Sequence, residues 1–333
     1  MSDRSSRPVV LVLSLGGTIA MTRIPGEGGA VPRLTAADLL GAVPDIGRFA
    51  DLVAEDVSRL PGASLPVETV VEVAGRIRAA ESEGVAGVVI TQGTDTLEET
   101  AWLLDLLYGG PLPVVLTGAM RNPSLPGADG PANLLAAVQT AAAPGLRGVG
   151  AVVVFADEIH TARRVRKIHS SSVAAFASPG AGPVGHIVEG APRLFTTPPR
   201  TPAVPTPAGT GTGVRVEVVT AALGSTGVLL EGLEERVDGL VVAAFGAGHV
   251  PADWVPQLER ITGRIPVVLA SRTGSGSTLS GTYAFPGSES DLLARGLIGA
   301  GTLDPLKARL LLLALLAGGA DRAGVAGAFP RYR

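Results

Sequence analysis

The stretch that decides the fold is AGVVITQGTDT, residues 86–96, where an apolar run passes directly into amide, hydroxyl, glycine and carboxylate side chains. Similar apolar runs recur at 9–15 (VVLVLSL), 113–118 (PVVLTG) and 149–155 (VGAVVVF). Unbroken runs of this kind are typical of strands covered on both faces, and hence of a mostly parallel sheet. Segments with helical spacing, 66–84, 96–110 and 130–143, separate the runs. The alternation predicts an α/β fold with a doubly wound sheet.

The chain of 333 residues is long enough for two domains. We expect a large N-terminal α/β domain over 1–190 and a smaller α/β domain over 215–333, where apolar runs and helical spacing resume. The intervening residues, 191–214, are rich in Pro, Thr and Gly and predict a linker.

Composition narrows the classes of function. Residues are 46% hydrophobic but only 4% aromatic, and the formal net charge is −3, so a nucleic-acid partner is disfavoured. The chain has no cysteine, and its four histidines are too scattered to indicate a metal site by spacing. The apolar runs are too short for a signal peptide or a membrane span. We therefore expect a cytoplasmic protein that uses no metal or cofactor and contacts no membrane.

Ligands of open parallel sheets bind beyond the carboxyl ends of the strands. The first expected strand is followed by Gly16, Gly17 and Thr18. Glycines let the backbone approach a ligand closely, and the Thr18 hydroxyl can then face the crevice. The alternative is a tight turn in which Thr18 caps a helix. The chain has neither GxGxxG nor a phosphate-loop lysine here, so nucleotide binding is weakly supported.

The polar end of the opening stretch has two interpretations. Thr96 and Glu99 have the spacing of a capping box, and Gly93 supplies the turn. Thr94 and Asp95, with Gln92, are left unexplained by capping. A hydroxyl beside a carboxylate can activate a nucleophile or hold a water, while the carboxylate binds a substrate ammonium group. The residues alone leave capping and function open.

The third candidate is the basic run HTARRVRKIH, residues 160–169. An exposed basic helix face is the usual interpretation of such a run. However, lysine occurs only at Lys167 and Lys307. An ammonium that is desolvated or close to other cations can lose its proton near neutral pH, whereas a guanidinium cannot. The neighbouring Arg163, Arg164 and Arg166 either favour that neutral form or face solvent. A neutral lysine can act as general base in a Thr-Lys-Asp relay.

Together, the motifs GGTIA (16–20), TQGTDTLEETA (91–101) and LTGAMRNPSLPGADGPANL (116–134) resemble those of the bacterial-type L-asparaginase/glutaminase family. The segments 152–187 and 280–316 also fit that family in order and spacing, and the resemblance is weakest over 190–215. It implies a large N-terminal and a smaller C-terminal α/β domain. It also implies a homotetramer built from tight dimers, or a homodimer, with active sites near subunit interfaces.

The resemblance assigns catalytic roles to four residues. Thr18 matches the threonine that attacks the side-chain amide to form an acyl-enzyme ester, and Thr94 matches the second catalytic threonine. Lys167 and Asp95 complete the relay with Thr94, and Asp95 also contacts the substrate α-amino group. Further substrate-binding positions, several of them acting through the backbone, are implied at Gly17, Gly62, Ala63, Ser64, Gly93 and Ala119.

Three positions depart from the family pattern. The loop 21–34 has no tyrosine, whose place falls near Ala30 or Val31. Gly62 stands where a serine is frequent, although its N–H can still bind a carboxylate and Ser64 can add a hydroxyl. His249 stands where the family often has an asparagine that reaches the site of a neighbouring subunit.

The resemblance predicts an L-asparagine amidohydrolase that produces L-aspartate and ammonia. A preference for L-glutamine is an open alternative, as is a catalytically weak amino-acid-binding or sensor protein of the same fold. The related subunit that releases ammonia for transamidation on tRNA is disfavoured, since it normally carries an extra N-terminal domain. This chain begins almost directly with its first expected strand.

Overall fold

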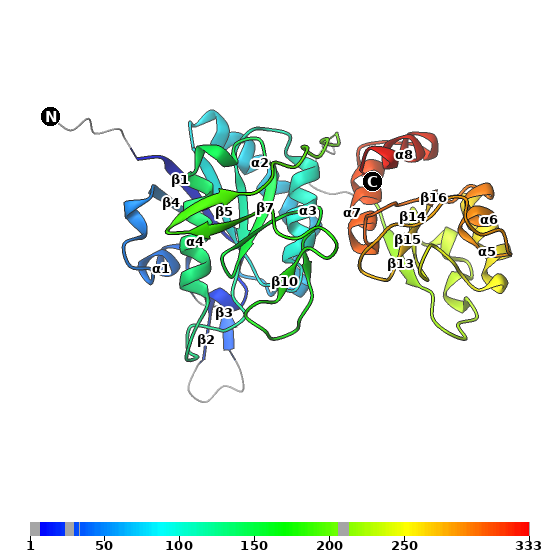
Figure 1. The fold of residues 1–333 in the computed structure, drawn as a ribbon, viewed down its shortest axis with the longest axis horizontal. Coiled ribbons are helices and arrows are strands. Elements are labelled where there is room, and N and C mark those ends of the chain that lie inside the picture. The colour runs from blue at the N-terminus through cyan, green and yellow to red at the C-terminus, as the bar shows by residue number, and fades with distance from the viewer. Residues whose placement is uncertain (1–6, 24–29, 33, 206–212, 333) are drawn as a thin grey trace. The chain divides into compact units, whose positions relative to one another are not determined.

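The computed structural model describes residues 7–23, 30–32, 34–205 and 213–332. The chain divides into two compact units, Met1–Thr201 (unit 1) and Pro202–Arg333 (unit 2), shown in Figure 1. Unit 1 holds the three polar stretches singled out in the sequence.

Unit 1 is built on one sheet of eight strands, in the order β12-β11-β8-β7-β6-β5-β1-β4. The neighbours from β4 to β7 pair in parallel, and the strands from β7 to β12 pair antiparallel. The mostly parallel sheet expected from the sequence is thereby confirmed. Its strands are β1 Val9–Ser14, β4 Asp51–Asp56, β5 Gly87–Thr91, β6 Val114–Thr117, β7 Ala151–Phe155, β8 Glu158–Thr161, β11 Gly185–Val188 and β12 Ala191–Leu194.

The order of the parallel strands creates a switch point between β1 and β5. From β1 the chain moves outward to β4, and it then returns to the other side of β1 to form β5, β6 and β7. Connections therefore leave β1 and β5 in opposite directions, and in such sheets ligands bind beyond the carboxyl ends of these strands. Thr18 follows β1 and Thr94 follows β5, so both lie at the edge where this rule places a ligand.

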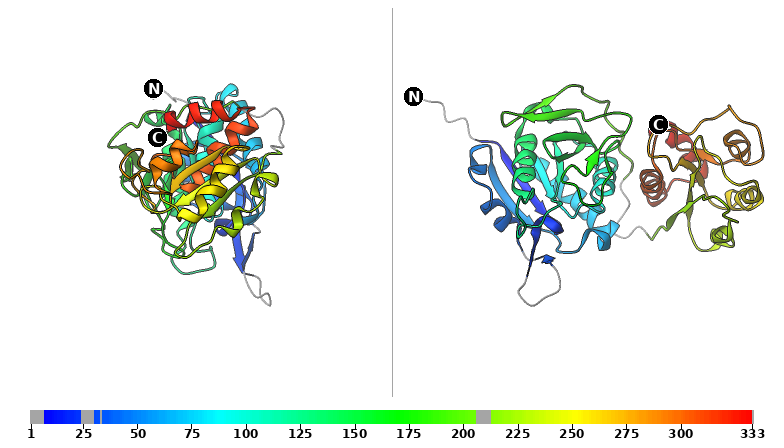
Figure 2. Two further views of the ribbon diagram at one scale, coloured as in Figure 1. Left: turned by 90° about the vertical axis from the view of Figure 1, so that its right-hand side faces the viewer. Right: turned by 60° about the horizontal axis from the view of Figure 1, so that its bottom comes forward.

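Helices cover both faces of the sheet, as the right-hand view of Figure 2 shows. On one face, Val10 and Val12 of β1 pack in one cluster with Leu39 of α1 and Leu134 of α4. Strand alternation turns the fully buried Leu11 and Leu13 to the other face, where α3 packs on β6 and β7 and contacts α2. The helices are α1 Ala36–Gly41, α2 Val67–Ser82, α3 Leu97–Leu107 and α4 Gly130–Ala142.

Two smaller two-stranded sheets complete unit 1. β2 (Met21–Arg23) pairs with β3 (Ala30–Pro32) in a hairpin that projects from the body in Figure 1. It occupies the described part of the loop expected over 21–34; residues 24–29 and 33 lie outside the described residues. β9 (Arg166–Lys167) pairs with β10 (Phe176–Ala177). The short 3-10 helices used below are η1 Thr18–Ala20 and η3 Gly62–Ser64.

Two local expectations differ from the structure. The basic run 160–169 contains no helix, so an exposed basic helix face is wrong; it forms the end of β8, a turn and β9. Pairing with Phe176 and Ala177, which lie outside the run, overrides the local charge pattern here. Residues Ala191–Leu194, placed in the expected linker 191–214, form β12 and pair with β11.

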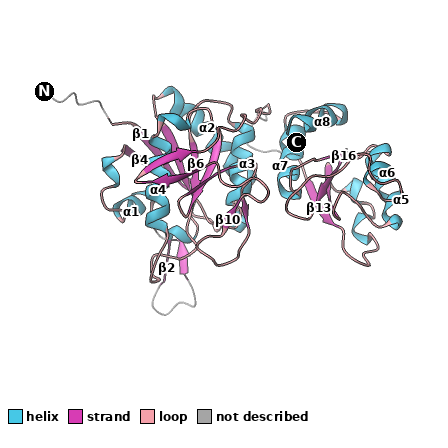
Figure 3. Cartoon of the chain, in the orientation of Figure 1, coloured by secondary structure: helices cyan, strands magenta, loops and turns pink. Residues whose placement is uncertain are grey.

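Unit 2 contains a smaller parallel sheet, which Figure 3 shows with helices around it. The strand order is β13-β14-β15-β16, with α7 against β13, β14 and β15. The opposite side is packed by Trp254, Leu258 and Leu292. The strands are β13 Val216–Thr220, β14 Gly239–Ala244, β15 Val267–Ser271 and β16 Ile298–Gly299, and the helices are α5 Val255–Thr262, α6 Glu289–Ala294, α7 Pro305–Ala317 and α8 Arg322–Ala328.

None of the helices in the described ranges combines the length and apolar character that crossing a bilayer requires.

We expect Gly87→Ala to destabilise unit 1. A Cβ at Gly87 would lie 2.1 Å from the carbonyl oxygen of Ala141, which belongs to the backbone of α4 and cannot rotate away. Such overpacking typically costs about 1–3 kcal/mol. The urea-unfolding midpoint of the variant should therefore fall.

Gly75→Ala provides the matched control. Gly75 is exposed in α2 with no atom within 4 Å of its added Cβ, so alanine should stabilise by roughly 0.5–1 kcal/mol. Equal midpoints for Gly87→Ala and the unaltered chain would contradict the close packing of β5 on α4.

Candidate active site

Lys167 joins Thr94 and Asp95 in direct hydrogen bonds. Its Nζ donates to Thr94 Oγ1 at 3.0 Å and to Asp95 Oδ1 at 2.7 Å. Thr94 is 6% exposed, whereas the Asp95 side chain is 67% exposed. The lysine thus links a buried hydroxyl to a carboxylate that faces outward. This is the spacing that a nucleophile, a base and an orienting group require.

The backbone of Lys167 is held by the same segment that carries Thr94. Pairing of Lys167 with Phe176 places it in β9, and its amide N–H donates to Glu98 Oε2 at 3.1 Å. Glu98 is buried in the first turn of α3, immediately after Asp95 and Thr96. Charge-assisted bonds of this kind are stronger than neutral ones. Both ends of Lys167 are therefore fixed to the start of α3.

Three glycines bring the loops after β1, β4 and β5 into backbone contact. A Cβ at Gly17 would lie 2.1 Å from the Gly93 nitrogen, and one at Gly62 would lie 3.2 Å from the Gly93 carbonyl oxygen. Gly17 also has φ 91°, a conformation that favours glycine. These glycines therefore let the three loops of the protein approach one another closely. This approach places Thr18 and Gly62 beside the Thr94 segment.

Thr96 does not form the expected capping box. It is the N-cap residue of α3, but its side chain makes no capping hydrogen bond. Its Oγ1 instead donates to the Gly62 carbonyl at 2.9 Å and accepts from Gln92 Nε2 at 2.9 Å. The expectation fails because a carbonyl from a distant loop takes the hydroxyl. Gln92, unexplained by the sequence, is thereby buried as the partner of Thr96.

The other sequence-predicted residues lie around this centre. Thr18 opens η1 and is not a helix cap, because Gly17 holds that position. Within the described residues, the Thr18 hydroxyl makes no hydrogen bond to Thr94, Asp95 or Lys167. η3 holds Gly62 buried and leaves Ala63 and Ser64 exposed, while Ala119 is fully buried after β6.

Two further side chains, not identifiable from the sequence, support the loop after β6. Asp129 accepts the amide N–H groups of Met120 and Arg121 at 3.0 and 2.8 Å. Asn133 donates to the Gly118 carbonyl at 3.0 Å and accepts from the Ala156 N–H at 3.0 Å. These bonds fix the loop that carries Ala119. The motif at 116–134 contains both residues, but its letters alone do not show which backbone groups they bind.

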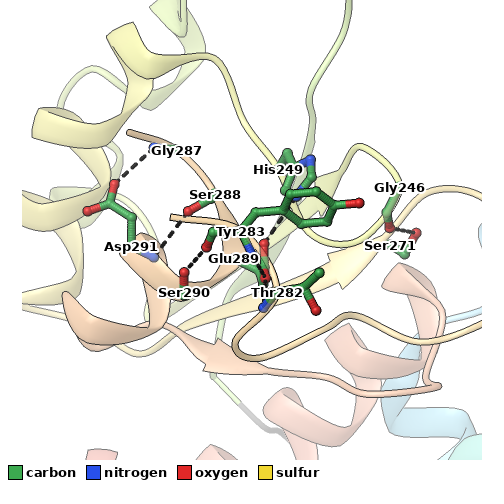
Figure 4. Close-up of polar contacts among 10 residues, drawn as sticks. All are labelled: Gly246, His249, Ser271, Thr282, Tyr283, Gly287, Ser288, Glu289, Ser290 and Asp291. Atoms are coloured by element: carbon green, nitrogen blue, oxygen red, sulfur yellow. Dashed lines mark hydrogen bonds and ion pairs between the residues drawn. The ribbon is translucent and has the colours of Figure 1, made fainter. Parts of the chain in front are cut away.

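In unit 2, His249 belongs to a cluster around a buried carboxylate, shown in Figure 4. Glu289, which has no exposed surface, lies 3.1 Å from His249 Nε2 and accepts from the amides of Thr282 and Tyr283, each at 2.8 Å. Burial raises the pKa of Glu289, but the bonds from Tyr283, Thr282 and His249 outweigh it and lower that pKa overall. The His249 ring also meets the Tyr283 and Phe285 rings edge-on. Contacts within unit 2 thus set the position of the His249 side chain.

Across the described residues, no three His, Asp or Glu side chains gather closely enough to hold a metal ion.

Comparison with known proteins finds matching families for both parts of the chain. Residues 9–200 match the family described as Asparaginase, N-terminal, and residues 215–329 match the Glutaminase/Asparaginase C-terminal domain. A Probable L-asparaginase of Deinococcus radiodurans is 39% identical over 98% of each chain. A Glutaminase-asparaginase of Pseudomonas fluorescens biotype A is 30% identical over 92% of this chain and 86% of that protein. The crystal structure of a probable cytoplasmic L-asparaginase from Campylobacter jejuni superposes with a TM-score of 0.84 at 32% identity, covering 97% and 99% of the two chains.

We expect Thr96→Val to destabilise unit 1. Valine keeps the shape but removes the donor to the Gly62 carbonyl and the acceptor for Gln92, and a lost partner in such a site costs about 1–3 kcal/mol. The change should appear as a lower urea midpoint.

Thr96→Ser is the matched variant, because it keeps the hydroxyl and should retain most of the stability. Equal losses in the valine and serine variants would show that the methyl group, and not the hydroxyl, stabilises this loop contact.

Proposed function

Because this chain belongs to the L-asparaginase family of hydrolases, we propose that it hydrolyses L-asparagine to L-aspartate and ammonia. The single observation that carries the proposal is the Lys167 Nζ bonded to both Thr94 and Asp95. These three side chains come from two segments that are 73 residues apart in the chain, yet they meet at the switch point of the sheet.

In the proposed reaction, the Thr18 hydroxyl oxygen adds to the side-chain amide carbon of asparagine. Its proton passes to the leaving amide nitrogen, and ammonia departs to leave a Thr18 ester. Water then cleaves this ester, which releases aspartate and restores the hydroxyl. The Thr94-Lys167-Asp95 relay supplies and accepts the protons for these steps. This assignment is supported by the continuous hydrogen-bond path through Lys167.

The remaining roles concern binding. We propose that the exposed Asp95 carboxylate binds the α-ammonium group of the substrate while it holds Lys167. The exposed Ser64 and the backbone of Gly62 and Ala63 are proposed to bind the α-carboxylate. Amide groups near Gly17, Gly93 and Ala119 are proposed to stabilise the oxyanion, which preorganised backbone donors do effectively. The cytoplasmic location and the homotetramer or homodimer expected from the sequence stay predictions.

We expect Thr18→Ala and Lys167→Met to lose ammonia release from L-asparagine. Removing a nucleophile that acts with its relay should lower kcat by about 10³-fold or more, and removing a general base by about 10²–10⁴-fold. Ammonia production by the purified variants is measured, with circular dichroism to confirm folding.

Thr220→Ala serves as the control for loss of a hydroxyl, because Thr220 is exposed in unit 2. Undiminished turnover by a folded Thr18→Ala protein would exclude the proposed ester.

We expect L-asparagine to be preferred over L-glutamine in kcat/KM by at least about 10-fold, since one methylene typically changes transition-state binding by about 10–200-fold. One relative is named Glutaminase-asparaginase, so a preference for L-glutamine is the alternative to be tested. Steady-state rates with each amide distinguish them. Tight aspartate binding without ammonia release from either amide would instead favour the binding or sensor protein.

A further inference from the structure

A cavity of about 230 Å³ in unit 1 lies at the opposite end of the sheet from Thr94. Its wall includes Ala151, the first residue of the parallel strand β7, and Thr161, the last residue of the antiparallel β8. Both are at the amino end of the parallel strands, whereas Thr94 follows the carboxyl end of β5. The cavity is therefore separate from the candidate active site.

The side chains that line the cavity include more positively charged groups than negatively charged ones. Arg163 and Arg164 line it, and the carboxylate that lines it with them is Asp105. Asp105 is 6% exposed and already accepts the Ala151 N–H at 2.8 Å. A guanidinium keeps its charge in proteins, so the described lining of the cavity carries two fixed positive charges and one carboxylate.

Burial disfavours the charged forms of both Asp105 and Arg163. Burial raises the pKa of Asp105, although Thr201, Ala151, Arg200 and Arg163 act against that effect. Burial, followed by the charge of Arg164, lowers the pKa of Arg163, and Asp105 acts in the opposite direction. The two guanidinium groups thus repel each other in a partly desolvated place. An incoming anion would relieve this repulsion.

Arg164 is the side chain best placed to receive such a ligand. It is half-buried at the cavity wall, and no carboxylate of the described residues forms an ion pair with it. Guanidinium groups bind carboxylate and phosphate oxygens through paired N–H donors. The volume is smaller than the roughly 300–1,000 Å³ usual for larger ligands, so the ligand is of amino-acid size or less.

From this geometry we propose that the cavity beside Arg163 and Arg164 is a binding site for a small oxyanion, a carboxylate or a phosphate. The proposed anion site is connected to the candidate active site by the backbone that follows Arg164. Arg164 lies in the turn after β8, held by its N–H to the Thr161 carbonyl at 3.0 Å, and β9 with Lys167 follows directly. Occupancy would therefore stabilise the turn that presents Lys167.

Calorimetric titration of the full chain with inorganic phosphate, and separately with succinate, tests the proposal at constant ionic strength set by sodium chloride. We expect saturable binding of at least one anion, weakened 10-fold or more in Arg164→Gln. Arg48→Gln removes the same charge at a side chain that is 74% exposed in unit 1, and its binding should match the unaltered chain. Comparing the two anions distinguishes a phosphate ligand from a carboxylate ligand.

Ala181→Asp is a second variant, which places a carboxylate at the exposed part of the cavity wall and should abolish binding while leaving both arginines in place. Absence of saturable heat with both anions, or equal affinity in Arg164→Gln and Arg48→Gln, would overturn the proposal. Because binding is measured directly, these outcomes are independent of whether the chain hydrolyses asparagine.

Discussion

The backbone contact among Gly17, Gly62 and Gly93 is the constraint on which the rest of the site depends. A parallel sheet brings strand ends to one edge, but side chains normally keep the following loops apart. Here the ideal Cβ positions of Gly17 and Gly62 fall 2.1 and 3.2 Å from backbone atoms of Gly93. At Gly17 a side chain would collide with the Gly93 backbone, and at Gly62 it would be crowded; the close approach places Thr18, the Gly62–Ser64 segment and Thr94 within one small region.

The start of α3 then ties this region to a third segment. Thr94 and Asp95 precede the helix, Thr96 bonds to Gly62, and Glu98 bonds to the amide of Lys167. The Thr96 side chain does not cap the helix and instead binds the Gly62 carbonyl across the site. The acidic side chains Glu98 and Glu99 in the first turn are favourable at the positive end of the helix dipole. Local helix stability and site assembly thus use different side chains of one short segment.

Charge is distributed differently at the two ends of the sheet in unit 1. At the carboxyl end, Lys167 is matched by Asp95, and its backbone by Glu98. At the amino end, Arg163 and Arg164 line a cavity together with the largely buried Asp105. The turn between β8 and β9 connects the two ends within a few residues. A group that orders this turn therefore acts on the segment that presents the lysine.

The sequence by itself determined the fold class and the position of the polar residues at strand ends, because apolar runs and helical spacing are local patterns that burial on both faces requires. It also indicated Thr94, Asp95 and Lys167, through residue types that capping and solvation left unexplained. It could not determine that 160–169 forms strands and a turn, that Thr96 bonds to Gly62, or that Glu98 holds Lys167. Those features depend on partners up to 69 residues away, as in the Glu98–Lys167 bond, and only the tertiary structure brings such partners together.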